Sequence, residues 1–330
     1  QSMKKLKKYL GDDKFIFEEL NSDTFLKDII KENEICFVNW DKLVSQNKKT
    51  GEYLNLLMKD NEIDNNLPKI IKNTRETNRE IILIVDEAHY AYWSQKSQDL
   101  VNNIIKPKLT IEVSATPQIV PKPRDIVNKN SGYVSINFDE VVESGLIKKN
   151  ININPKLIIN NNTKDQILLT SALKKRTEIL EIYKSIGVNI NPLLMIQLPS
   201  DSSNTTNDDD SKIKFVIKFL TENNITFKNR KLALWLSDEK NKINLKNPDI
   251  EELDSKVEVL IFKQAASLGW DCPRAQLLVL FREMKSQIFE IQTMGRILRM
   301  PQGVHYNKEE LNYAYIFSNL GEKFKIYNDE

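Results

Sequence analysis

Residues 81–89 read IILIVDEAH, and this stretch decides the fold class. Residues 81–85 are all β-branched or aliphatic, a pattern typical of a strand that is buried on both faces of a parallel sheet. Asp86 and Glu87 follow at its carboxyl end, where ligands bind in open α/β sheets. Asp86 is suited to hold Mg²⁺ through water, and Glu87 to orient and deprotonate an attacking water. A strand followed by a helix cap explains the same residues, because Asp is a common N-cap.

A second strand of the same kind follows along the chain. Residues 94–105 have a helical pattern, and residues 109–113 predict a strand that ends in SATP, from Ser114 to Pro117. Hydroxyl groups at the carboxyl end of this strand can hydrogen-bond to the neighbouring acidic turn. A simple Ser/Thr turn before proline is the alternative for this tetrapeptide.

Strands and helices alternate through the rest of the chain. Strands are predicted at 34–43, 193–198, 231–236, 257–262, 277–281 and 312–317, and helices at 67–76, 138–145, 164–186 and 212–220. This alternation is typical of parallel α/β sheets. A junction near residues 146–165 separates two halves of similar rhythm, so we expect two related α/β lobes, residues 1–145 and 146–330.

The stretch KSQIFEIQTMGRILRMP, residues 285–301, predicts a helix with two distinct faces. Gln292, Arg296 and Arg299 share one face. Apolar residues on another face are expected to pack inward, namely Ile291, Met294 and Leu298. Two planar guanidinium groups on a rigid helix suit a clamp for a phosphoryl group that is being transferred. A solvated basic helix face is the alternative.

The stretch KQAASLGWDCPR, residues 263–274, lies past the end of a predicted strand, again on the ligand side. Asp271 in this stretch can accept a hydrogen bond from a ribose hydroxyl or position a neighbouring arginine. An ordinary turn aspartate is the alternative.

Composition excludes several classes of protein. The 330 residues are 40% hydrophobic and 28% charged, which suits a globular protein with two domains. A net charge of +2 gives no strongly basic nucleic-acid footprint across the whole chain, although a local basic groove is compatible with it. Cys36 and Cys272 form no disulfide framework or zinc spacing, so a cytoplasmic location is expected. No apolar run reaches the roughly 18 residues of a membrane span.

Four motifs appear in a fixed order, namely DEAH at 86–89, SAT at 114–116, GWD at 269–271 and Q-x-x-G-R-x-x-R at 292–299. Together, on two α/β lobes, they resemble a superfamily two helicase or translocase. Within that superfamily, the chain more closely resembles the restriction (Res) subunit of type III restriction enzymes. Three runs carry this resemblance, namely FVNWDKL, KQAASLGWDCPRA and FEIQTMGRILRMP. The resemblance covers most of residues 35–318 and implies two RecA-like parallel-sheet lobes of a helicase core.

For the first lobe, the resemblance implies a role for each motif residue. Asp86 and Glu87 resemble the Walker B pair that serves Mg²⁺ and the attacking water. His89 is similar to the residue that links the acidic box to other motifs. Ser114 and Thr116 resemble the motif that couples hydrolysis to movement.

For the second lobe, the resemblance assigns two further motifs. Gly269 and Asp271 resemble the fifth motif, near the nucleotide and the nucleic-acid backbone. Gln292, Arg296 and Arg299 resemble the sixth motif, with both arginines as fingers on the γ-phosphate. An arginine finger raises the rate of phosphoryl transfer by roughly 10³–10⁵.

The function that the resemblance implies is ATP-dependent DNA translocation within a type III restriction endonuclease. ATP and Mg²⁺ are the implied cofactors, and double-stranded DNA and a methyltransferase (modification) subunit are the implied partners. Two alternatives remain open. One is another motor of the same superfamily, acting in repair, in type I restriction or on RNA. The other is a non-catalytic nucleic-acid-binding module.

The chain departs from the family pattern in two respects. No G-x-x-x-x-G-K-[ST] phosphate loop occurs in the 330 residues, and Lys49-Thr50-Gly51 has the wrong order. We therefore expect the first lobe to be incomplete at its N-terminus and the nuclease domain to be missing after residue 330. We also expect the isolated chain to be inactive, because nothing evident holds the β- and γ-phosphates.

Overall fold

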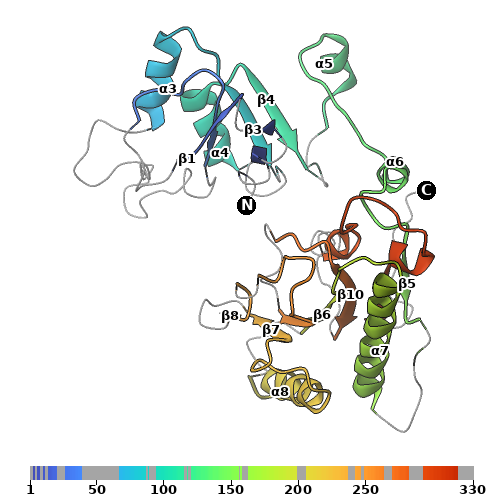
Figure 1. The fold of residues 1–330 in the computed structure, drawn as a ribbon. Coiled ribbons are helices and arrows are strands. Elements are labelled where there is room, and N and C mark those ends of the chain that lie inside the picture. The colour runs from blue at the N-terminus through green and yellow to red at the C-terminus, as the bar shows by residue number, and fades with distance from the viewer. Residues whose placement is uncertain are drawn as a thin grey trace. The chain divides into compact units, whose positions relative to one another are not determined.

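The computed structural model of the chain divides into two compact units, Gln1–Val134 and Ser135–Glu330 (Figure 1). We had placed the boundary between the two motif-bearing lobes after residue 145, and that boundary stays a prediction. The structure describes residues 3, 6–7, 10–11, 14–20, 27–38, 67–86, 88, 94–114, 117, 120–155, 157, 163–198, 206–236, 242–246, 249–263, 270–281 and 293–318.

The first unit contains two short parallel sheets among its described residues. Strand β1 (Ile16–Glu19) pairs with β2 (Glu34–Phe37), and β3 (Ile82–Asp86) pairs with β4 (Leu109–Val113). Helices of this unit with described bounds are α3 (Leu67–Glu76), α4 (Gln95–Asp99), the π-helix η1 (Leu100–Ile105) and α5 (Pro123–Val127).

Helices α3 and η1 supply most of the first unit's core. In α3, Pro68 is the second residue, a position where its missing N–H costs nothing. Ile70 and Ile71 then face inward and pack with Leu100 and Ile105 of η1. The helix predicted at residues 67–76 is therefore confirmed.

One prediction about β3 is wrong. The strand at residues 81–85 was expected to be buried on both faces, but Ile84 is 62% exposed and Ile82 is also exposed. In β4, Leu109, Ile111 and Val113 are exposed as well. The reason is that Leu83 and Val85 pack inward with Ala88 and Val101, whereas no described element covers the opposite face.

The second unit is built on a seven-stranded sheet with the order β5-β11-β10-β6-β9-β7-β8. The pairings are parallel except that of β7 with β8. The strands are β5 (Asn150–Ile153), β6 (Leu193–Gln197), β7 (Leu232–Trp235), β8 (Lys242–Ile243), β9 (Val259–Phe262), β10 (Ala275–Leu280) and β11 (Tyr313–Ser318). The other elements are α6 (Phe138–Glu143), α7 (Lys164–Ser185), α8 (Thr206–Glu222) and the 3-10 helix η4 (Glu309–Asn312) (Figure 1).

Apolar layers cover both faces of this sheet. Leu169 of α7 and Val216 of α8 belong to the core on one face, with Leu194 and Ile196 of β6. On the other face, Trp270 and Ile297 pack with residues of β6, β9 and β10. Every residue of β6, β9 and β10 is buried, as expected for a parallel sheet that is covered on both sides.

The α/β fold class with a mostly parallel sheet is therefore confirmed. The helix predicted at 164–186 corresponds to α7, which begins after a capping box formed by Thr163 and Gln166. Among the described residues, no helix is long and apolar enough to span a membrane.

Candidate functional site

The acidic motif and the SAT motif begin side by side in the first unit. The register of the parallel pair β3–β4 places Asp86 opposite Val113, and Ser114 follows directly. The amide of Ala88 donates a hydrogen bond to the carbonyl of Val113 at 3.1 Å. The turn after Asp86 is therefore tied to the end of β4, where Ser114 begins the second motif.

Asp86 offers an exposed carboxylate at this edge, and Ser114 is half-buried beside it. Carboxylate oxygens suit Mg²⁺, which is commonly bound by one or two carboxylates and several waters. Among the described residues, no three His, Cys, Asp or Glu side chains gather as a metal site. Asp86 thus fits the water-mediated contact that the sequence predicts. Five predicted site residues lie outside the described residues, namely Glu87, His89, Thr116, Gly269 and Gln292.

The predicted helix at 285–301 is wrong in its last turn. Residues 293–297 are helical, but residue 298 is a turn and Arg299 forms an antiparallel bridge with Ile147. The helix ends there because backbone groups of residues 146–148 pair with those of residues 298–300. Arg296 and Arg299 therefore do not share one continuous helix face, and residues 285–292 lie outside the described residues.

The two predicted finger arginines differ in exposure. Arg296 is buried at 7%, whereas the side chain of Arg299 is 42% exposed. Arg299 forms an ion pair with Asp271. This contact agrees with one of the roles considered for Asp271, the positioning of a neighbouring arginine. Met294 and Leu298 pack against the sheet, as expected, and Ile297 is buried beside them.

Lys148 was not among the predicted site residues, yet it is a fully buried lysine beside residues 296–300, which we call the arginine turn. Its Nζ donates to the carbonyl of Ile297 at 2.8 Å and to that of Arg299, and its backbone amide donates to Leu298 at 2.6 Å. Burial lowers the pKa of Lys148 to about 7, and the nearby Cys272 thiol offsets part of this shift. No local signal could have found this contact, because the partners are 149 residues apart.

The Arg274 side chain, next to the GWD motif, serves packing. It is fully buried and donates to the carbonyls of Ile250, Asn191 and Val257 at 2.7–2.9 Å. Burial lowers its pKa, with the Cys272 thiol acting in the opposite direction. Because its donors point at backbone carbonyls within the unit, Arg274 joins the start of β6 to the segment before β9.

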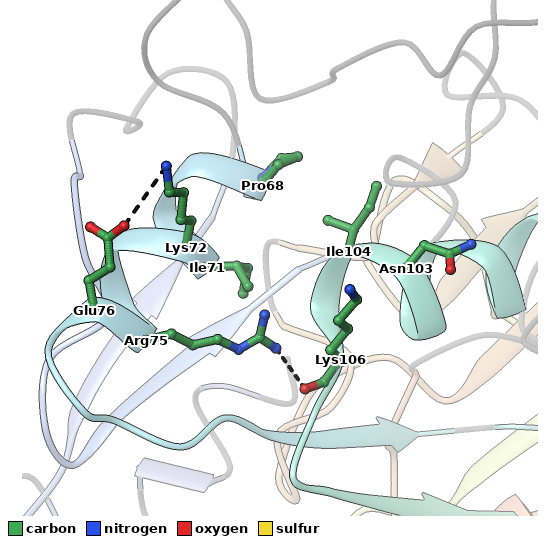
Figure 2. Close-up of a pocket in the computed structure, with 8 residues that line it drawn as sticks. All are labelled: Pro68, Ile71, Lys72, Arg75, Glu76, Asn103, Ile104 and Lys106. Carbon is green, nitrogen blue, oxygen red and sulfur yellow. Dashed lines mark hydrogen bonds and ion pairs between the residues drawn. The ribbon is translucent and has the colours of Figure 1, made fainter.

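A groove between α3 and η1 lies in the first unit and includes none of the predicted site residues (Figure 2). Arg75 crosses it and donates to the carbonyls of Ile105 and Lys106, the latter at 2.6 Å. Lys72 pairs loosely with Glu76 at 3.8 Å. Arg75 thus closes the C-terminal end of η1, and the groove is the seam between the two helices.

A family model is similar to the first part of the chain. Residues 1–119 match the family model described as "Type III restriction enzyme, res subunit". No curated protein gives a significant match.

Several solved structures are similar at low identity. The Saccharomyces cerevisiae protein Dbp5 bound to RNA and ADP BeF3 has 15% identity and a TM-score of 0.47, covering 96% of this chain and 67% of that one. A fragment of a putative HsdR subunit of a type I restriction enzyme from Vibrio vulnificus YJ016 has 14% identity and a TM-score of 0.49, covering 95% and 55%. The ATP-dependent type ISP restriction-modification enzyme LlaBIII bound to DNA has 13% identity and a TM-score of 0.40, covering 96% and 25%.

The chain thus spans about half of the HsdR fragment and a quarter of LlaBIII. The family match, which spans residues 1–119 of the 330, is a similarity of the first part of the chain. Residues 1–119 are thus similar to the res subunit of type III restriction enzymes.

Proposed function

We propose that the chain is part of the ATP-hydrolysing motor of a type III restriction enzyme that moves along double-stranded DNA. The observation that carries the proposal is the close pairing of the acidic and SAT motifs. The hydrogen bond from Ala88 to Val113 joins them at the carboxyl edge of β3 and β4, within the residues that match the Res family. Ligands of open α/β sheets bind at such edges.

Each residue would contribute a different part of phosphoryl transfer. ATP and Mg²⁺ supply the phosphoryl group and a charge-neutralising cation when bound. Asp86 would hold the cation through water, and Glu87 would accept a proton from the attacking water. Arg299 would stabilise the charge that develops on the transferring group, while Asp271 fixes the direction of its guanidinium.

Arg296 has a different place in this proposal. The side chain of Arg296 is buried, whereas that of Arg299 is 42% exposed. Of the two, Arg299 is therefore the arginine that a phosphate could reach. Arg296 would serve as a second finger only after the packing around it changes. Gln292, Gly269, His89, Ser114 and Thr116 keep the roles that the motif resemblance implies.

The test is ATP turnover, with and without double-stranded DNA, in the natural protein that carries this chain. We expect Glu87→Gln to lower turnover by at least 10²-fold, since general base catalysis contributes about 10²–10⁴. Glu112→Gln, on the neighbouring strand β4, is the matched control and should turn over like the wild type. Normal turnover by Glu87→Gln would refute the proposal. Stimulation by RNA in place of DNA would favour another motor of the superfamily.

A non-catalytic nucleic-acid-binding module is the second candidate, favoured by the absence of a phosphate-loop motif from the 330 residues. The isolated chain should then bind DNA without nucleotide and lose affinity steeply as salt rises. Both candidates predict negligible ATP turnover by the isolated chain. They separate in the natural protein, where a modification subunit and DNA are the proposed partners.

A further inference from the structure

Lys148 donates hydrogen bonds to three successive carbonyl groups of the arginine turn, those of residues 297–299. Its Nζ donates to Ile297 and Arg299, and its backbone amide donates to Leu298. The last carbonyls of a helix have no partner within the helix, and a cation near them interacts favourably with the helix dipole. Lysine is well suited to this position because its terminal amino group carries several N–H donors on a flexible stem.

The neighbours of Lys148 complete a strap, which we define as residues 146–148. Ile147 bridges Arg299, and the amide of Met300 donates to the carbonyl of Leu146 at 3.0 Å. Arg299 therefore has strap contacts on both sides of its backbone. The Arg299 side chain, which extends from this fixed backbone, forms the ion pair with Asp271.

The strap is itself fixed from its other side. His305 Nε2 lies 2.9 Å from the carbonyl oxygen of Ile147, within hydrogen-bonding distance. Gly145, just before the strap, has a φ of +76°, and a Cβ there would lie 3.1 Å from Cα of Val304. Glycine permits both the positive φ and this close approach. The strap is thus held between the arginine turn and residues 304–305.

We propose that Lys148 is a positioning residue that holds Arg299 in place for its phosphate partner. Lys148 cannot touch a substrate, because its side chain is fully buried, whereas the Arg299 side chain is 42% exposed. Lys148 fixes the backbone of Arg299, and Asp271 directs its side chain. A displacement of about 1 Å at such a group can cost on the order of 10²-fold in rate.

The positional part of this inference depends only on the second unit. The catalytic part rests on the proposed function. Two measurements on the same variants separate these parts.

Lys148→Met keeps the length and apolar stem of the side chain but removes its donors. Arg176→Met is the matched control, because Arg176 is also buried and also donates to a carbonyl, that of Pro192, away from the arginine turn.

The first measurement is amide hydrogen exchange in the full chain, read over residues 296–300. Lys148→Met should accelerate exchange at these residues by on the order of tenfold, because their end of the helix opens more often. Arg176→Met should leave exchange at 296–300 unchanged. If Lys148→Met exchanges its amides at residues 296–300 at the wild-type rate, the inference is overturned. If Lys148→Met does not fold, Lys148→Gln, which keeps a shorter amide donor, should show the same acceleration to a smaller degree, and wild-type exchange in that variant overturns it equally.

The second measurement is ATP turnover by the natural protein. Lys148→Met should lower kcat by roughly tenfold or more and leave KM for ATP within about threefold, since a misplaced Arg299 affects the transition state more than binding. Arg176→Met should keep the wild-type kcat at temperatures where both variants are folded. An unchanged kcat in Lys148→Met, when Arg299→Ala is inactive, overturns the catalytic part. Unchanged turnover in Arg299→Ala itself refutes the proposed function instead.

Discussion

The acidic end of β3 and the arginine turn at 296–300 are fixed in different ways. Asp86 ends a strand of a two-stranded sheet, and the backbone amide of Ala88 donates a hydrogen bond to Val113 at the end of β4. The arginine turn lies over a seven-stranded core and is bonded to Lys148, Ile147 and Leu146. Stabilising a transition state by charge requires a group that is already in position before the reaction. By this criterion the contacts of the second unit suit an arginine that is positioned in advance.

The largest expected contrast is in the cores beneath the two motifs. Ile84 of β3 is 62% exposed and Ile196 of β6 is 0% exposed. Ile196→Ala should destabilise the second unit by about 2–5 kcal/mol, since it opens a cavity in a packed core. Ile84→Ala should change the stability of the first unit by no more than about 0.5 kcal/mol. Hydrogen exchange under increasing urea reports each unit separately. A large loss of stability in Ile84→Ala would show that the exposed face of β3 is covered in solution, and the two cores would then not differ.

The pH dependence of stability sharpens the contrast through Lys148. Its pKa is about 7 in the folded protein, below its ordinary value of 10.5. Between these two values the unfolded chain binds more protons, so the second unit should gain stability as pH rises from about 7 to about 10. We expect Lys148→Met to lack a gain of about 1–3 kcal/mol over this range.

The measurement is urea unfolding of the second unit at several pH values, with the difference between wild type and Lys148→Met as the quantity compared. The contributions of the other titratable groups are the same in both proteins, so they cancel in this difference. A difference that stays constant from pH 7 to 10 would mean that Lys148 keeps an ordinary pKa despite its burial. The first unit should show no response to this substitution.

The smallest expected effect concerns the Arg299–Asp271 ion pair. Because the Arg299 side chain is 42% exposed, water screens the pair, and its coupling should be about 0.2–1 kcal/mol. A double-mutant cycle with Arg299→Met and Asp271→Asn measures this coupling, and added salt should reduce it. A coupling well above this range would indicate that Asp271, rather than Lys148, is the main support of Arg299.

Much of the second unit could be predicted from sequence. The continuous apolar run at 193–198 predicted the fully buried β6, and the amphipathic pattern at 164–186 predicted α7. These signals are local, because each residue's environment repeats along one element. The same reasoning was wrong for β3, since a run of aliphatic residues does not show whether both faces of a strand are covered.

The arginine turn shows what the sequence could not reveal. The periodicity of residues 285–301 favoured one helix, but tertiary pairing with residues 146–148 ends it after residue 297. Lys148 sits in the polar segment IKKN, where a lysine is normally exposed. Its burial depends on carbonyl groups 149 residues away, and a sequence pattern carries no record of such a distance.

The most direct test of the account is ATP turnover by Arg299→Ala in the natural protein, measured with the affinity for nucleotide. Arg299→Lys is the control for charge, and Arg176→Met is the control for the loss of an arginine elsewhere in the second unit. We predict that Arg299→Ala lowers turnover by roughly 10³-fold or more while nucleotide affinity changes by less than about tenfold. Turnover at the wild-type rate in Arg299→Ala would contradict the claim that this chain contributes an arginine to phosphoryl transfer.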